Sequence, residues 1–161
     1  MSDVQNNKFQ QPGRLKVVQG SILAPHNAGL RFILNLVSLS GQITNNPLYA
    51  IYDKKWPKIK EAARGWYAMK TGEYKLGAVN VTAVQSDVWC LHLLCQDENN
   101  KTDINGLTKC LKEVCKMAKY ENSGVHVSRL LTEAVPEITE LLTTHLVRQG
   151  VSVSFYEEPS Q

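Results

Sequence analysis

The chain has 161 residues, a length that favours one domain, because two cores of half this size would each be small. Hydrophobic residues make up 43% and charged residues 20%, a composition that is typical of a globular protein and excludes a disordered or fibrous one. No apolar run approaches the roughly 18 residues of a membrane span, and the first residues are too polar for a signal peptide. The net charge of +3 permits an anionic partner without requiring one.

The first part of the chain predicts a leader, two strands and two helices. Residues 1–13 are polar and end in Pro12-Gly13, which indicates a flexible leader before a single domain over residues 14–161. The expected elements are strands at 15–18 and 31–37 and helices at 45–52 and 56–72. The second strand is apolar at almost every position, so we expect it to be covered on both faces.

The second part predicts a hairpin and then helices that alternate with strands. Two apolar runs joined by the polar residues 85–87 favour an antiparallel hairpin. Pro136 and Gly150 are suited to the start and the end of the last helix. The expected elements are strands at 76–84, 88–95, 125–127 and 152–156 and helices at 103–119 and 136–149. This alternation predicts an α/β fold, and the hairpin makes its sheet mixed.

The four cysteines form two C-x4-C pairs, Cys90/Cys95 and Cys110/Cys115, which superficially suggest a zinc site. Side chains five residues apart lie on opposite faces of a strand and about 140° apart on a helix, so neither pair is suited to share a metal. We therefore expect four reduced thiols and no metal. Free thiols are typical of a reducing compartment, so we expect an intracellular protein of the nucleus or the cytoplasm.

Three histidines, His92, His126 and His145, fall within apolar elements. His92 and Cys90 share one face of the predicted strand, but no acidic residue there would orient the imidazole for nucleophilic catalysis. We expect all three histidines to be core residues with hydrogen-bond partners.

Lysines alternate with aromatic residues in residues 49–60 (YAIYDKKWPKIK), a pattern that can bind phosphates and stack bases. Helical spacing accounts for Tyr49, Tyr52 and Trp56 as residues that anchor helices to the core, and no wider basic field surrounds them. A nucleic-acid partner is therefore permitted but not favoured.

Polar loops follow several of the predicted strands, over residues 20–29, 38–47, 96–102 and 128–136. Ligands of open α/β sheets bind at the carboxyl ends of strands, where small and polar residues let backbone amides hold an anion. The pattern is compatible with a mononucleotide-like ligand or with none.

Short motifs in order along residues 15–158 resemble the macro domain family, whose members bind ADP-ribose. The opening KVVQGSIL resembles the family's strand and Gly-Asp/Asn-Ile/Leu turn, and ILNLVSLSGQITNNPLYAIYDKKWP resembles the next strand, glycine loop and helix. WPKIKEAARGWYAMKTGEYKLGAVNVTAV is similar to the helix and strand that follow, and VHVSRLL and GVSVSFYEE are similar to the closing elements. The branch with the terminal ADP-ribose protein glycohydrolase and the chromatin remodeller amplified in liver cancer is the most similar. The resemblance implies a three-layer α/β/α fold with a mixed sheet.

The resemblance also implies which residues hold the ligand. The set is Gly20, Ser21 and Ile22 for the adenine end, Gly41 and Asn45 for the ribose side, Ser128 and Arg129 for the diphosphate, and Phe155 or Tyr156 for stacking on adenine. We expect no cofactor, and the cysteine geometry above favours no metal.

The loop after the second strand and the loop before the last helix both depart from the family's pattern. The first keeps Gly41 but then reads QITNNP over residues 42–47. Ser21 stands where the family has Asp or Asn, and residues 128–132 (SRLLT) lack the glycines of the second loop. The glycohydrolase's catalytic lysine would fall near residues 95–96, where there is none, and Glu133 is the one carboxylate in the shortened loop that should carry its aspartate. We therefore predict a non-catalytic module that binds ADP-ribose or a related nucleotide weakly, in a cleft that its own loops partly fill.

Two alternatives stay open. One is a protein–protein interaction domain that has lost the ligand, and the other is an ADP-ribosyl hydrolase with an unusual acid or base. We also expect a protein partner and no association with membranes.

Overall fold

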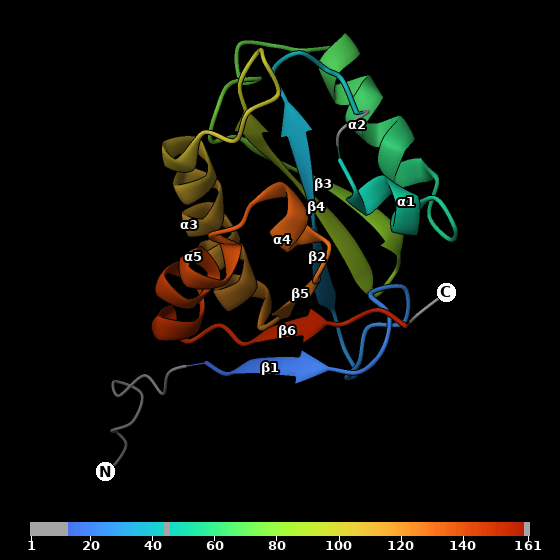
Figure 1. The fold of residues 1–161 in the computed structure, drawn as a ribbon, viewed down its shortest axis with the longest axis vertical. Helices are drawn as coiled ribbons and strands as arrows, with labels where there is room; N and C mark the ends of the chain where they lie inside the picture. Colours follow the sequence, from blue (N-terminus) through green and yellow to red (C-terminus); the bar gives the residue numbers. More distant parts are fainter. Residues whose placement is uncertain (1–12, 44–45, 160–161) are drawn as a thin grey trace.

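The structure, a computed structural model, describes residues 13–43 and 46–159. Within these residues the chain forms one six-stranded sheet with helices on both faces (Figure 1). The strands are β1 (Leu15–Val18), β2 (Arg31–Ser38), β3 (Val79–Gln85), β4 (Val88–Gln96), β5 (Gly124–Ser128) and β6 (Val153–Tyr156). The helices are α1 (Leu48–Tyr52), α2 (Lys58–Ala68), α3 (Ile104–Glu121), α4 (Leu131–Ala134), α5 (Ile138–His145) and the 3-10 helix η1 (Val147–Gln149).

The sheet has the strand order β1-β6-β5-β2-β4-β3. Every neighbouring pair is parallel except β3 and β4, which form the predicted antiparallel hairpin. The α/β fold with a mixed sheet is therefore confirmed. Because β1, β2, β4, β5 and β6 run in the same direction, their carboxyl ends meet at one edge of the sheet, where ligands of open α/β folds bind.

The core lies on both faces of the central strands. Every residue of β2 after Arg31 is buried, because β5 and β4 flank the strand and helices cover both of its faces. Helices α3 and α5 lie on one side of the sheet and α1 and α2 on the other (Figure 1), which confirms three layers. The outer strands β1 and β3 are partly exposed, as expected at the two edges.

Some element boundaries differ from the prediction for local reasons. β3 begins at Val79 rather than at residue 76, because Gly77 has a φ of 99° that no extended strand adopts. The loop predicted at residues 128–136 contains α4, which is too short to show a helical period in the sequence. Helix α5 begins at Ile138, just after the predicted start at Pro136.

The predicted division into a leader and one domain stays a prediction. Residues 1–12 lie outside the described part of the chain, and the amide of Gly13 donates to the carbonyl of Val147 at 2.7 Å. Over residues 13–43 and 46–159, no helix combines the length and the apolar character that a bilayer span requires.

Candidate functional site

Two hollows adjoin helix α1 at the carboxyl edge of the sheet. The larger hollow has a volume of about 780 Å³ and the smaller one about 340 Å³. The larger hollow is lined by Ile43, Asn46, Pro47, Tyr49, Ala50, Asp53, Lys60, Arg64, Glu133 and Ala134. The smaller hollow is lined by Ser21, Leu23, Ile51, Lys54, Arg129, Leu130, Glu158 and Pro159.

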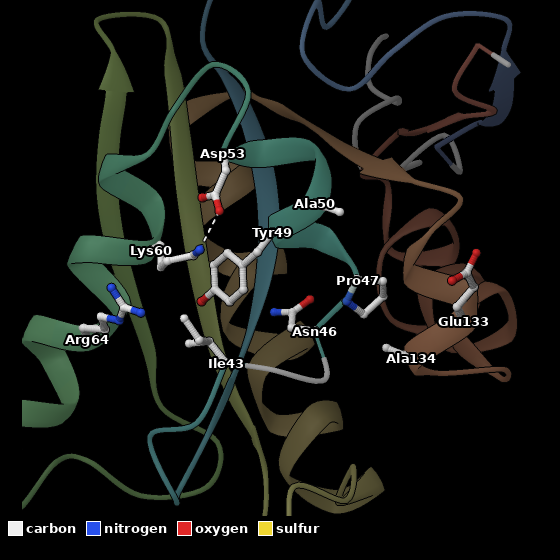
Figure 2. A pocket seen from close by; sticks show the side chains of 10 residues that line it. All are labelled: Ile43, Asn46, Pro47, Tyr49, Ala50, Asp53, Lys60, Arg64, Glu133 and Ala134. Atoms are coloured by element: carbon white, nitrogen blue, oxygen red, sulfur yellow. Dashed lines mark ion pairs between the residues drawn. The ribbon is translucent and has the colours of Figure 1, made fainter. Parts of the chain in front are cut away.

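The larger hollow has a mixed electrostatic character. Figure 2 shows Tyr49 between Asn46 and the two basic residues Lys60 and Arg64, with Glu133 on the far side of the pocket. Lys60 forms an ion pair with Asp53, and its Nζ lies 5.7 Å from the centre of the Tyr49 ring. Among the described residues, a hollow lies between the chain before α1 and helix α4, and the expectation that the loops partly fill the cleft stays a prediction.

A buried polar network lies behind Asn46 and Tyr49, two residues that line the larger hollow. Asn35 Nδ2 on β2 donates to the Tyr49 hydroxyl at 3.0 Å and to His92 Nδ1 at 3.1 Å. Asn35 Oδ1 accepts from Asn46 Nδ2 at 3.0 Å. Because Nδ1 of His92 accepts, its Nε2 carries the proton and donates to Thr82 Oγ1 at 2.9 Å. The network joins α1 to three strands and fixes the positions of Asn46 and Tyr49.

Neither ionisable group of this network is suited to proton transfer at neutral pH. Burial raises the pKa of Tyr49 to about 12 and lowers the pKa of His92 to about 4. The phenol and the imidazole are therefore both neutral at pH 7, and they act as fixed hydrogen-bond partners. This confirms His92 as a core histidine.

The first glycine loop is held by contacts within the protein. Gly41 has a φ of 77°, and a Cβ at this position would lie 2.6 Å from the ring of Tyr67, so packing requires glycine here. Asn46 Oδ1 accepts from the amide of Leu48 at 2.9 Å, which uses a donor at the start of α1. Asn45, predicted at the ribose side, lies outside the described residues.

The second loop likewise uses most of its own amides. The amide of Arg129 donates to Tyr156 O at 2.8 Å, and the amide of Leu130 donates to Ser128 Oγ at 3.2 Å. The amides of Thr132 and Glu133 donate to carbonyls one turn earlier. Ser128 itself is buried beneath the loop. A diphosphate at this loop therefore meets amides that are already bonded.

The smaller hollow brings together the predicted adenine end and the predicted diphosphate residue. Ser21 and Arg129 both line it, although 108 positions separate them in the chain. Lys54 of the turn after α1 adds a second cation. Glu158, which the sequence analysis missed, supplies a carboxylate whose Oε2 accepts from the amide of Ile22 at 3.1 Å. No local pattern in the sequence indicates that residues so far apart lie side by side in the fold.

The two aromatic residues predicted to stack on adenine are both buried. Tyr156 has no exposed surface, and its hydroxyl accepts from the amide of His26 at 2.7 Å and lies 2.8 Å from His126 Nδ1. Phe155 lies in the core as well. Neither ring offers a free face to a base in this structure, because β6 carries both side chains into the interior.

The cysteines and the remaining histidines are mostly core residues. Cys90, Cys95 and Cys110 are buried, and burial raises the pKa of Cys110 to about 12. His126 is buried, and its pKa is lowered to about 4, mainly by burial. The prediction for His145 is wrong, because it lies half-exposed at the end of α5.

Two observations concern metal and catalytic chemistry. In the described part of the chain, no three His, Cys, Asp or Glu residues lie close enough together to hold a metal ion. Near the position expected for the glycohydrolase lysine, Cys95 is fully buried. Glu133 is exposed, and its carboxylate lies 3.8 Å from the guanidinium of Arg129.

Comparison with known proteins gives the class of fold. No family model matches the chain, and no curated protein matches it. A macrodomain protein from Streptomyces coelicolor is similar with a TM-score of 0.79 at 22% identity, over 91% of this chain and 100% of that one. A protein of unknown function from Bacteroides thetaiotaomicron is similar with a TM-score of 0.76 at 22% identity, over 89% of this chain and 98% of that one. The macrodomain of Thermus aquaticus DarG has a TM-score of 0.64 at 16% identity, over 90% and 99%.

The chain therefore has the macrodomain fold, as the resemblance in the sequence implied. The identities are low enough that the likeness concerns the fold alone. The branch predicted from the sequence motifs stays a prediction.

Proposed function

We propose that this protein is a non-catalytic macrodomain that binds ADP-ribose or a related nucleotide weakly. One observation carries the proposal: the smaller hollow gathers Ser21, Lys54 and Arg129 at the carboxyl edge of a macrodomain sheet. Two cations beside a polar loop suit a diphosphate, because charge-assisted hydrogen bonds are the strong ones at such sites.

The ligand spans the two hollows in this proposal. Its base and diphosphate occupy the smaller hollow beside Ser21 and Arg129, and its distal ribose extends past α1 toward Asn46 and Tyr49 in the larger hollow. Both hollows are lined by residues of the chain segment that contains α1, which supports one ligand across both.

Weak binding follows from the state of the loop amides. The amides of Leu48, Leu130 and Thr132 already donate within the protein, and Pro47 has no N–H. Each missing charge-assisted bond lowers the affinity by about 1.5–3 kcal/mol. Two of them convert a dissociation constant of about 1 µM into about 100 µM or weaker.

The proposal includes the absence of hydrolase activity. Hydrolysis of an ADP-ribosyl bond requires an acid or base within hydrogen-bond reach of the ribose. Cys95 is buried where a lysine is expected. Of the two carboxylates that line the larger hollow, Asp53 pairs with Lys60, and Glu133 lies across the hollow from Tyr49, 3.8 Å from the Arg129 guanidinium (Figure 2). We expect no release of ADP-ribose from an auto-modified polymerase above the level without protein; release above that level would contradict this part of the proposal.

Calorimetric titration with ADP-ribose, supported by backbone amide spectra, tests the binding. We expect saturable shifts in residues 20–22 and 129–134, with a dissociation constant of about 100 µM or weaker. Ribose 5-phosphate alone is the control and is expected to bind more weakly, because it lacks the adenosine and one phosphate. Binding at low micromolar concentration would contradict the weak site, and no shift at millimolar ligand would contradict the nucleotide site.

The internal bonding of the loop amides also favours a second candidate, the interaction domain that has lost its ligand. A surface whose donors are satisfied without ligand is suited to a protein partner, which needs less precise charge contacts. Absence of any nucleotide shift would favour this candidate. A protein partner, and a location in the nucleus or the cytoplasm, stay predictions in both cases.

A further inference from the structure

The chain after β6 returns across the predicted adenine end of the site. The amide of Glu157 donates to Val18 O at 3.0 Å, and the amide of Glu158 donates to Gly20 O at 2.9 Å. These bonds hold residues 157–159, here called the tail, beside the loop that follows β1. Glu158 and Pro159 consequently form part of the lining of the smaller hollow.

The tail occupies two donors that a ligand would need. The amide of Ile22 donates to Glu158 Oε2 at 3.1 Å, and Arg129 Nε donates to Glu157 O at 2.6 Å. Both Ile22 and Arg129 belong to the set predicted for the nucleotide. The carboxylate of Glu158 thus takes the place that a ring nitrogen or an anionic oxygen of a ligand would fill.

Two features of the tail's conformation are energetically unfavourable. Glu158 Oε1 is buried and has no hydrogen-bond partner among the described residues, and an unpaired buried carboxylate oxygen raises the free energy of a conformation. Glu158 also has a φ of 64°, in the left-handed region that residues with a Cβ rarely adopt. A contact with these costs can be displaced by a ligand that supplies better partners.

We propose that the tail is a strap that closes the smaller hollow, and that a nucleotide binds only after Glu158 has left the amide of Ile22. This inference rests on the proposed function and names its regulation. The apparent affinity equals the intrinsic affinity multiplied by the fraction of molecules with the strap open. Part of the weakness of the site is therefore reversible, and anything that draws the tail away strengthens nucleotide binding.

The test compares Glu158→Ala with wild type and with Glu98→Ala. Glu98 is exposed in the loop after β4 at the same edge of the sheet, so its variant removes the same charge without touching the strap. We expect Glu158→Ala to bind ADP-ribose about tenfold more tightly than wild type, since one bond to a charged group is lost from the closed state. Glu98→Ala is expected to stay within about threefold of wild type.

A second measurement does not depend on affinity. Without ligand, the amide of Ile22 should exchange with solvent faster in Glu158→Ala than in wild type, because it loses its acceptor. In wild type, saturating ADP-ribose should move the amide signals of Glu157 and Glu158 toward the values of an unstructured chain. Tail signals that stay unchanged at saturation would overturn the strap.

The outcomes separate the two proposals. Binding by wild type with equal or weaker binding by Glu158→Ala overturns the strap and leaves the nucleotide site standing. Binding by Glu158→Ala alone supports the strap, because the closed strap then hides the site, and contradicts the weak binding proposed for the wild-type protein. Absence of binding in every variant, with native amide spectra, overturns both.

Discussion

The two hollows beside α1 are built in opposite ways. Beneath the larger one, Asn35, Asn46 and His92 bond to one another, and each polar group has a partner. In the smaller one, Glu158 has a left-handed backbone and a buried oxygen that has no partner within residues 13–43 and 46–159. Satisfied buried networks rigidify a protein, whereas regions of low local stability open first. We therefore infer a fixed wall, the Asn35–Asn46–His92 network, beside the larger hollow and a movable wall, the tail, beside the smaller one.

The largest expected effect comes from a substitution of Asn35, the central residue of the polar network that forms the fixed wall. Asn35→Leu removes both donors to Tyr49 and His92 and the acceptor for Asn46, which leaves buried polar groups unpaired. We expect the free energy of unfolding to fall by about 3–5 kcal/mol, measured by urea unfolding. The matched control is Asn99→Leu at an exposed position, with an expected change below about 0.5 kcal/mol. A loss under about 1 kcal/mol for Asn35→Leu would mean that the network does not stabilise the wall.

Acid is expected to destabilise the fold through two buried histidines. His92 contacts Asn35 and His126 contacts Tyr156, and the pKa of each is lowered to about 4 from its ordinary value of 6.5. The unfolded chain therefore binds more protons between pH 6.5 and 4, so stability is full above 6.5 and is lost as the pH falls toward 4. The loss amounts to about 3 kcal/mol for each histidine over this range.

Urea unfolding at several pH values between 4.5 and 7.5 measures this dependence. His92→Gln should make the dependence shallower by up to about 1.4 kcal/mol per pH unit. His145→Gln is the control, because His145 is half-exposed and should contribute much less. Equal pH dependence in wild type and His92→Gln would contradict the buried neutral imidazole.

The sequence predicted the strands around the two hollows better than the hydrogen bonds between residues far apart in the chain. β1 matches its predicted bounds because a short apolar run ends at a glycine, and β2 extends one residue further than predicted. The bond from Asn35 to His92 and the bond from Ile22 to Glu158 join residues 57 and 136 positions apart. Local periodicity carries no information on such pairs, since strand order decides them.

The site residues show the same limit. Ser21 and Arg129 were chosen by likeness to motifs, and the parallel strands bring them together. Tyr156 was chosen in the same way, but every residue of β6 is buried, so its ring lies inside the protein. Gly41 matches a glycine of the family for another reason, the ring of Tyr67.

A smaller effect is expected at Gly41, in the loop between β2 and α1. Gly41→Ala places a Cβ 2.6 Å from the Tyr67 ring and forces a residue with a Cβ to adopt a φ of 77°, so we expect a loss of about 2 kcal/mol in urea unfolding. Gly65→Ala in α2 is the opposite control, since its Cβ meets open space and alanine favours a helix, with an expected gain of about 0.5–1 kcal/mol. If both substitutions change stability alike, packing against Tyr67 does not explain the glycine.

The smallest expected effect concerns Lys54, a cation that lines the smaller hollow. Lys54 lines the smaller hollow and is exposed, and Arg129, the other cation there, donates to the tail. Lys54→Ala should therefore weaken ADP-ribose binding about three- to tenfold in the same titration, with unchanged stability, because exposed charge pairs contribute little to folding. Lys116→Ala removes the same charge from the exposed face of α3 and is expected to change the affinity less than about twofold at 0.15 M salt. Raising the salt concentration should shrink the effect of Lys54→Ala, since the contact with phosphate is screened. An equal loss in both lysine variants would mean that net charge, rather than the smaller hollow, attracts the ligand.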